Sequence, residues 1–222
     1  MKLTLLIGVV SQKGGVGKST LARLLAREYA ASDWSVKIAD MDTQQGTCTH
    51  WASRRLQADR KPEIPVEQFN RLDRVLRQAD HYDLIIFDGA PHATNITRDI
   101  AKYSNLVILP TGYSLDDLLP TVKLAHELKR EGVPSSKIAI AFSRVGDSEA
   151  EAQEATRYVE ESGYFLLPGS IPERTAYRRA SDLGMALTET PFSSLSKKAD
   201  ELVSAIVRRM EVLEKQEEVS YA

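Results

Sequence analysis

Ser11-Gln-Lys-Gly-Gly-Val-Gly-Lys-Ser-Thr20 stands between an apolar run, residues 3–10, and a segment whose apolar residues have helical spacing, residues 19–31. Glycines let the backbone turn tightly and direct successive N–H groups at an anion, and the helix that follows adds its positive N-terminal end. In such a loop the Lys18 ammonium would reach terminal phosphates, and the Ser19 hydroxyl would bind magnesium. The sequence therefore predicts a strand, a phosphate-binding loop and a helix in that order.

Apolar runs suited to buried strands recur along the chain with helical segments between them. We expect strands at residues 3–10, 36–39, 84–87, 106–109, 138–142 and 164–167. We expect helices at residues 19–31, 68–79, 95–103, 115–130, 150–161, 174–183 and 193–215, and a loop at residues 59–65. This alternation predicts an α/β fold, a mostly parallel sheet with helices on both faces. We expect one domain over residues 1–222, with residues 216–222 as a frayed tail.

Composition and charge describe an ordinary globular chain. Its 222 residues include 29 Lys and Arg against 31 Asp and Glu, a formal net charge of −2. By that sum alone a nucleic acid is not an obvious partner. The single cysteine, Cys48, excludes an intrachain disulfide and a cysteine-only metal site, so a reducing compartment fits. No apolar run is long enough to cross a bilayer, and we expect a cytoplasmic protein.

Carboxylates follow two further expected strands. Asp40 and Asp42 come after the second strand, and Asp88 comes after the third. Ligands of such sheets lie outside the carboxyl ends of the strands. The fold should therefore bring these acids to the phosphate-binding loop, although they are far from it in sequence.

The loop departs from the strict phosphate-loop pattern, because Gln12 takes the position of its first glycine. The run Lys13-Gly-Gly-Val-Gly-Lys-Ser19 resembles the deviant Walker A motif of the ParA/MinD family of ATPases, which have a P-loop NTPase fold. The resemblance implies that Lys13 reaches across a homodimer to the phosphates of the partner's ATP, a second cation acting as an arginine finger does. It implies ATP and Mg²⁺ as cofactors. The residues that would hold the nucleotide are Gly14, Gly15, Val16, Gly17, Lys18, Ser19 and Thr20.

Two more segments extend the resemblance. Asp40-Met-Asp-Thr-Gln-Gln45 is similar to the family's switch I, where Asp42 would position the attacking water; Thr43 stands where the family usually has proline. Tyr82-Asp-Leu-Ile-Ile-Phe-Asp-Gly-Ala-Pro91 is similar to its Walker B and switch II segments. By that match, Asp88 holds magnesium through water, together with the Ser19 hydroxyl.

The stretch at residues 169–180 resembles the family's loop and helix after the last strand, in which Pro172 would border the adenine. Elsewhere in the family an asparagine often follows the preceding strand and reads the base. Ser143 and Arg144 occupy that region here. The preference for adenine therefore stays open, whereas phosphate binding is expected.

The net charge conceals local basic clusters, at residues 53–77, at residues 170–181 and on the last helix. Lys197 and Arg208 are 11 residues apart, as are Lys198 and Arg209, so each pair returns to one helix face. Solvated ion pairs with neighbouring acids would explain much of this pattern. DNA contact is the other reading, and the resemblance favours it because partition ATPases bind DNA without sequence preference as ATP dimers. The candidate residues are Arg178, Arg179, Lys197, Lys198, Arg208 and Arg209.

These patterns favour a positioning ATPase with a weak intrinsic rate, similar to small ParA partition proteins that lack an N-terminal helix-turn-helix domain. The partners would be a second copy of the chain, nonspecific DNA, and a ParB-like or adaptor protein that stimulates hydrolysis, with a plasmid or other cargo. The location would be cytoplasmic and nucleoid-associated. One alternative is a MinD-like membrane-associated division regulator, which the acidic C-terminal segment at residues 211–222 disfavours. The other is a metabolic ATP-dependent ligase on the same scaffold.

Overall fold

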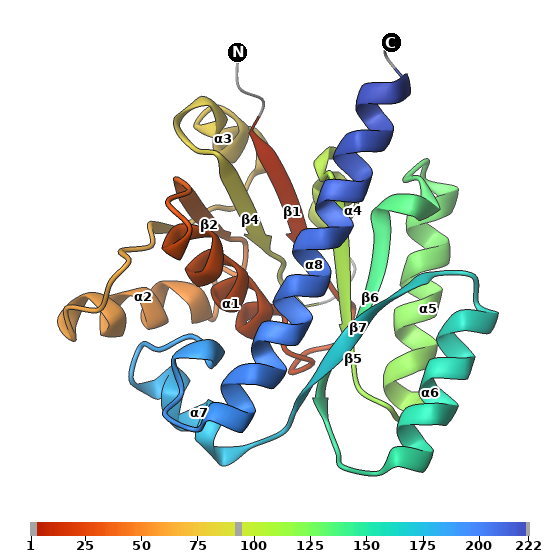
Figure 1. The fold of residues 1–222 in the computed structure, drawn as a ribbon. Coiled ribbons are helices and arrows are strands. Elements are labelled where there is room, and N and C mark those ends of the chain that lie inside the picture. Colours follow the sequence, from red (N-terminus) through yellow and green to blue (C-terminus); the bar gives the residue numbers. More distant parts are fainter. Residues whose placement is uncertain (1–3, 92–94, 221–222) are drawn as a thin grey trace.

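The computed structural model describes residues 4–91 and 95–220 and contains a seven-stranded parallel sheet (Figure 1). The strand order is β3-β2-β4-β1-β5-β6-β7. This confirms the parallel α/β fold expected from the sequence. The strands are β1 (Leu5–Val9), β2 (Val36–Asp40), β3 (Val66–Gln68), β4 (Leu84–Asp88), β5 (Leu106–Thr111), β6 (Ile138–Val145) and β7 (Phe165–Pro172).

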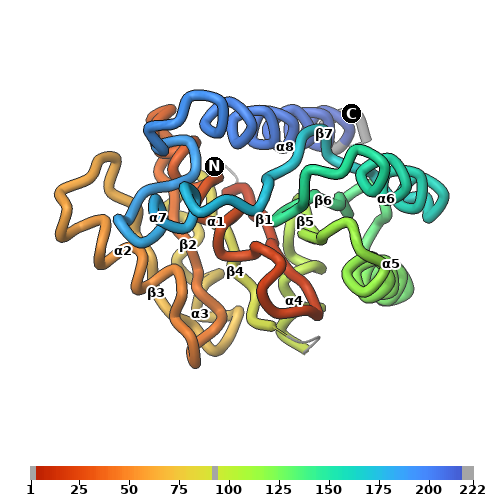
Figure 2. Tube along the Cα trace, turned by 90° about the horizontal axis from the view of Figure 1, so that it is seen from below, coloured from red at the N-terminus to blue at the C-terminus, as the bar shows by residue number. Residues whose placement is uncertain are grey.

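Helices cover both faces of the sheet, as Figure 2 shows from below. One core packs α1, α2, α7 and α8 on one face, and a second core packs α3, α4, α5 and α6 on the other. The central strands β1, β4 and β5, which lie between these cores, are mostly apolar and almost entirely buried, which is why each of them is a continuous apolar run. The helices are α1 (Lys18–Ala31), α2 (Thr47–Gln57), α3 (Leu72–Leu76), α4 (Asn95–Tyr103), α5 (Leu115–Arg130), α6 (Glu149–Glu161), α7 (Thr175–Asp182) and α8 (Ser193–Ser220).

The sheet register brings the acids to the phosphate-binding loop. Strand β4 lies between β1 and β2, with Asp88 opposite Val9 on one side and Asp40 on the other. The loop at residues 10–17 continues from β1, so it leaves the sheet directly beside Asp88. The expected meeting of strand ends is confirmed at this edge.

Several elements differ from the sequence expectations. Helix α2 was not expected, because the residues that it buries are Cys48, Trp51 and Arg55, and a buried arginine interrupts the apolar stripe. Residues 68–79 were expected to be one helix. They instead end the short edge strand β3 and form α3, because pairing with β2 extends the backbone at residues 66–68.

The last helix is also longer than expected, since α8 continues past residue 215 to Ser220 through residues with good helix propensity. Residues 216–220, which were expected to belong to a frayed tail, therefore lie in α8. Residues 221–222 lie outside the described part of the chain.

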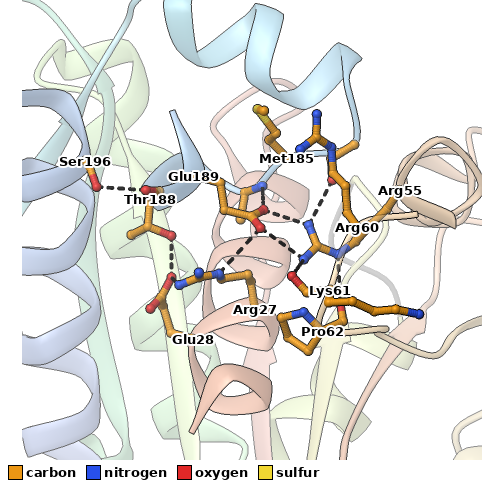
Figure 3. A network of polar contacts seen from close by, with 12 residues as sticks. Arg27, Glu28, Arg55, Arg60, Lys61, Pro62, Met185, Thr188, Glu189 and Ser196 are labelled. Carbon is orange, nitrogen blue, oxygen red and sulfur yellow. Dashed lines mark hydrogen bonds and ion pairs between the residues drawn. The ribbon is translucent and has the colours of Figure 1, made fainter. Parts of the chain in front are cut away.

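Arg55 anchors α2 to the rest of the molecule (Figure 3). Its guanidinium is 2% exposed and forms a two-point ion pair with Glu189, with N···O distances of 2.7 and 3.1 Å. It also donates to the backbone carbonyls of Lys61, Pro62 and Gly184. One buried side chain thus joins α2 to the loop before β3 and to the segment between α7 and α8.

Candidate active site

The phosphate-binding loop adopts a backbone that requires glycine. Gly15 and Gly17 have φ angles of +77° and +103°, in the region where a side chain is strained. A Cβ at Gly17 would also collide with the Ser143 hydroxyl at the end of β6. The close approach of the loop to the end of β6 leaves no room for a side chain at Gly17, which suits a cradle of backbone N–H groups around phosphate.

Lys18 is held over this cradle. Its side chain is buried, and its Nζ donates to the backbone carbonyl of Lys13 at 3.2 Å. Burial lowers the pKa of Lys18, while the nearby carboxylates of Asp88 and Asp42 act in the opposite direction. The ammonium is therefore positioned between the loop and the acids at the strand ends, where a phosphate chain would lie.

The buried carboxylate of Asp88 tests whether magnesium fits the site. Its side chain is 1% exposed, and neither carboxylate oxygen has a partner at hydrogen-bond geometry among the described residues. Burial raises the pKa of Asp88 to about 6, while the adjacent Ser19 hydroxyl and Cys48 thiol lower it. A buried carboxylate beside a hydroxyl is a ligand set that Mg²⁺ and its waters would satisfy. Ser19 and Asp88 therefore fit the expected magnesium site.

The segment after β2 is organised by Asp40. One oxygen of its fully buried carboxylate accepts the N–H groups of Cys48 and Thr49 in the first turn of α2, at 3.1 and 3.0 Å. The other accepts the Asp42 N–H at 3.2 Å. Asp42 in turn accepts the N–H groups of Gln44 and Gln45. These bonds form the turn without the proline that the resemblance expects at Thr43, and Asp42 remains at the edge of the site.

Residues 7–187 match the family described as the CobQ/CobB/MinD/ParA nucleotide binding domain. The chain belongs to this family. It is an ATPase of the ParA/MinD type, and ATP and Mg²⁺ are its cofactors.

Named relatives of this ParA/MinD-type ATPase agree with that assignment. The maintenance of carboxysome distribution protein A of Gloeobacter kilaueensis is 30% identical over 186 residues, covering 82% of this chain and 83% of the relative. Two solved structures share the fold. The cell division ATPase MinD of Pyrococcus furiosus has a TM-score of 0.74 at 19% identity, over 93% of this chain and 99% of that one. An ATP complex of Cyanothece McdA has a TM-score of 0.72 at 17% identity, over 93% and 97%.

The lysine that distinguishes this family's loop is bound within its own chain. Lys13 Nζ forms an ion pair with Asp117 in the first turn of α5, and it donates to the Asp116 carbonyl at 3.3 Å. Asp117 also accepts from the Ser114 hydroxyl at 2.9 Å. The Lys13 side chain is 42% exposed, so it lies at the surface of the ATPase and outside the phosphate cradle.

A cleft of about 380 Å³ runs from the phosphate-binding loop to α7. Pro172, which the family resemblance expects to border the base, lines this cleft together with Tyr177. Arg144 crosses one edge, donating to the Gly15 carbonyl at 2.5 Å and to Glu173 at 2.7 Å. Their proximity raises the pKa of Arg144 and lowers the pKa of Glu173. The sequence did not single out this pair, because it joins the ends of two neighbouring strands.

The six candidate DNA contacts fall into different environments. Lys197, Lys198 and Arg208 are exposed on α8. Arg178 lines the nucleotide cleft and pairs with Glu173, and Arg179 lines a separate groove beside α7. Arg209 is half-buried, with its guanidinium 4.3 Å from the centre of the Phe165 ring and a hydrogen bond to the Ser136 carbonyl. The structure therefore does not bring these six residues together as one surface.

The interactions that sequence reasoning missed are those of Asp117, Glu173 and Asp40. Asp117 had no signal of its own, since acids are common in the first turn of a helix. Glu173 follows Pro172 directly, and that position could have suggested a partner at the cleft. Asp40 was placed at the strand end without a role, although its spacing from Asp42 is the signal for a turn that both acids share.

No helix in residues 4–91 or 95–220 combines the length and apolar character needed to cross a membrane.

Proposed function

We propose that this ATPase is a positioning switch that forms a homodimer around ATP, with Lys13 of each copy completing the partner's phosphate site. The position of Lys13 carries the proposal. Its ammonium lies at the molecular surface, held by one partly exposed ion pair to Asp117. An exposed ion pair contributes about 0.2–1 kcal/mol. The phosphates of ATP bound to a second copy would offer the ammonium several negative charges in place of the one on Asp117. Moving Lys13 from Asp117 to those phosphates is therefore favourable once ATP is bound.

The remaining residues supply the hydrolytic site in this proposal. Lys18 and the loop N–H groups hold the phosphate chain, and Ser19 with Asp88 hold Mg²⁺, which neutralises phosphate charge. Asp42 orients the attacking water by accepting a hydrogen bond. Lys13 from the partner stabilises the charge that develops during transfer, so hydrolysis depends on dimerisation.

Nonspecific DNA is the surface on which the dimer would act. Support comes from Lys197, Lys198 and Arg208, which are exposed on one long helix. A dimer presents two such sets, so weak phosphate contacts add in free energy and are lost together on dissociation. The bound dimer would be nucleoid-associated, and a partner protein that stimulates hydrolysis would release it.

A large protein assembly is the cargo that the comparisons favour over a plasmid. The curated relative is named for maintaining carboxysome distribution. We propose that this chain likewise distributes a large protein assembly, and that an adaptor on the assembly is the partner that stimulates hydrolysis.

Dimerisation is tested by sedimentation velocity with and without ATP and Mg²⁺. The unmodified chain should double in mass with ATP. Lys13→Ala should still bind ATP, because the cradle and Lys18 are intact, but should stay monomeric and lose turnover. Lys123→Ala, an exposed lysine on α5, is the matched control and should dimerise normally. A dimer of undiminished activity in Lys13→Ala would overturn the proposed role.

DNA binding is tested by comparing two double variants in the ATP state. Lys197→Ala with Lys198→Ala should weaken binding to duplex DNA of any sequence and flatten its salt dependence. Lys129→Ala with Arg130→Ala removes the same charge from α5, on the other face of the sheet, and should change little. Equal losses in both pairs would show that general charge and not this surface is responsible.

A further inference from the structure

A groove of about 480 Å³ lies on the outer side of α7, separate from the nucleotide cleft. Two of the large apolar side chains that line it are more than half exposed to solvent: Leu183 at 57% and Phe192 at 56%. Leu183 is the first and Phe192 the last residue of the segment that joins α7 to α8. Ala176 and Ala180 also line the groove, and their small side chains leave it open.

Helix α7 divides its residues between this groove and the nucleotide cleft. Thr175, Ala176, Arg179 and Ala180 line the groove, and Leu183 continues the same helical stripe. The alternate stripe lines the cleft, with Arg174, Tyr177, Arg178 and Ser181. One short helix therefore has two faces, and a displacement caused at one face must move the other.

The ends of α7 connect the groove to the nucleotide site. The helix begins just after Pro172 and Glu173 at the cleft, and Glu173 pairs with Arg144 beside the phosphate-binding loop. After α7, the chain turns at Gly184, where φ is +70°. A Cβ there would collide with the backbone of Arg55 in α2, the helix whose first turn Asp40 holds.

Charge and polarity select the kind of occupant. Arg179 is the charged side chain among the groove's lining residues, and the Arg60 guanidinium lies at its edge, donating to the Leu183 carbonyl at 2.8 Å. An apolar floor with arginines at the rim fits a peptide that carries a bulky apolar anchor beside acidic residues. DNA phosphates would match the arginines but would leave Leu183 and Phe192 against a polar backbone.

We propose that this groove is the docking site for a short acidic and apolar segment of the protein that stimulates hydrolysis. The inference rests on the proposed function, since it assigns the place where the partner acts. Seating the apolar anchor between Leu183 and Phe192 shifts α7, and the cleft stripe of α7 transmits the shift to the nucleotide.

The test uses a displayed library of random peptides of about twelve residues, a length typical of groove ligands. The library is selected against the full chain with ATP and Mg²⁺, and recovered peptides are synthesised for affinity measurement. Leu183→Ser and Phe192→Ser alter side chains that are more than half exposed, so both should fold, which circular dichroism checks. Leu115→Ser on α5, where the leucine is 60% exposed, is the matched control.

We expect recovered peptides to share a bulky apolar residue flanked by Asp or Glu. Both groove variants should weaken their binding at least about tenfold, the control should not, and saturating peptide should raise ATP turnover of the unmodified chain. Failure to recover any peptide that depends on both residues overturns the proposal. So does a loss of DNA affinity, or of the ATP-dependent dimer, in the groove variants with peptide binding unchanged, which would assign the groove to DNA or to a second copy.

A failure of the groove proposal can be told apart from a failure of the proposed function. The proposed function fails if the unmodified chain does not dimerise with ATP, an experiment in which no groove variant takes part. The groove proposal fails on peptide affinity alone, with the dimer intact.

Discussion

Replacing Arg55 with alanine should destabilise the protein more than any exposed charge substitution. The guanidinium makes five hydrogen bonds, two of them to Glu189, and it is 2% exposed. Removing one partner of a buried ion pair costs about 3–5 kcal/mol, because the other charge stays buried. Glu189 keeps the Ala186 N–H at 2.7 Å and the Arg27 guanidinium at 3.6 Å, so we expect the lower end, about 3 kcal/mol.

Urea unfolding at 25 °C, followed by circular dichroism, measures this cost as a shift of the midpoint at constant slope. Arg55→Lys should lose part of the stability, since an ammonium keeps the charge but cannot form the two-point pair. Lys61→Ala breaks an exposed ion pair with Glu63 and should produce no measurable change. An Arg55→Ala variant that unfolds within about 1 kcal/mol of the parent would refute the claim that this side chain anchors α2.

Further changes test the nucleotide site. Burial raises the Asp88 pKa from 3.8 to about 6, so the folded chain loses stability as pH rises between those two values. Asp88→Asn should therefore raise the free energy of unfolding by on the order of 3 kcal/mol at pH 7.5 without magnesium, and by little near pH 4. Urea titrations at the two pH values check this, and equal gains would contradict it. Gly17→Ala should abolish ATP binding by calorimetry, since φ is +103° there and the Cβ meets the Ser143 hydroxyl, while Gly146→Ala, outside the cleft and with open space around it, should keep the affinity within about threefold. If both bind alike, the cradle argument is wrong. Asp117→Ala should tighten the ATP dimer about two- to fivefold in sedimentation by releasing Lys13, and an unchanged or weaker dimer would show that the pair does not compete.

The phosphate-binding loop and the strands other than β3 were predictable because their signals are local. A glycine loop between an apolar strand and a helix, and acids directly after apolar runs, need only short-range information. The parallel topology then places Asp40 and Asp88 at the loop.

Features built from long-range contacts were not predictable. Helix α2 buries Arg55, which is stable only because carbonyls and Glu189 from distant segments surround it. Local charge and helix spacing suggest the candidate DNA contacts. Neither can show that Arg178 is paired with Glu173 or that Arg209 packs on Phe165. DNA contact by these residues therefore stays a prediction, carried best by those that remain exposed.

The buried position of Cys48 has a practical consequence. The thiol is fully buried beside Asp88, and burial raises its pKa well above the usual value, so we expect alkylating reagents to modify it very slowly in the folded chain. A cysteine introduced on α8 or in the groove could thus carry a fluorophore without prior removal of the native one. Conversely, slow modification of Cys48 itself would time how often the first turn of α2 opens, and whether nucleotide keeps it closed.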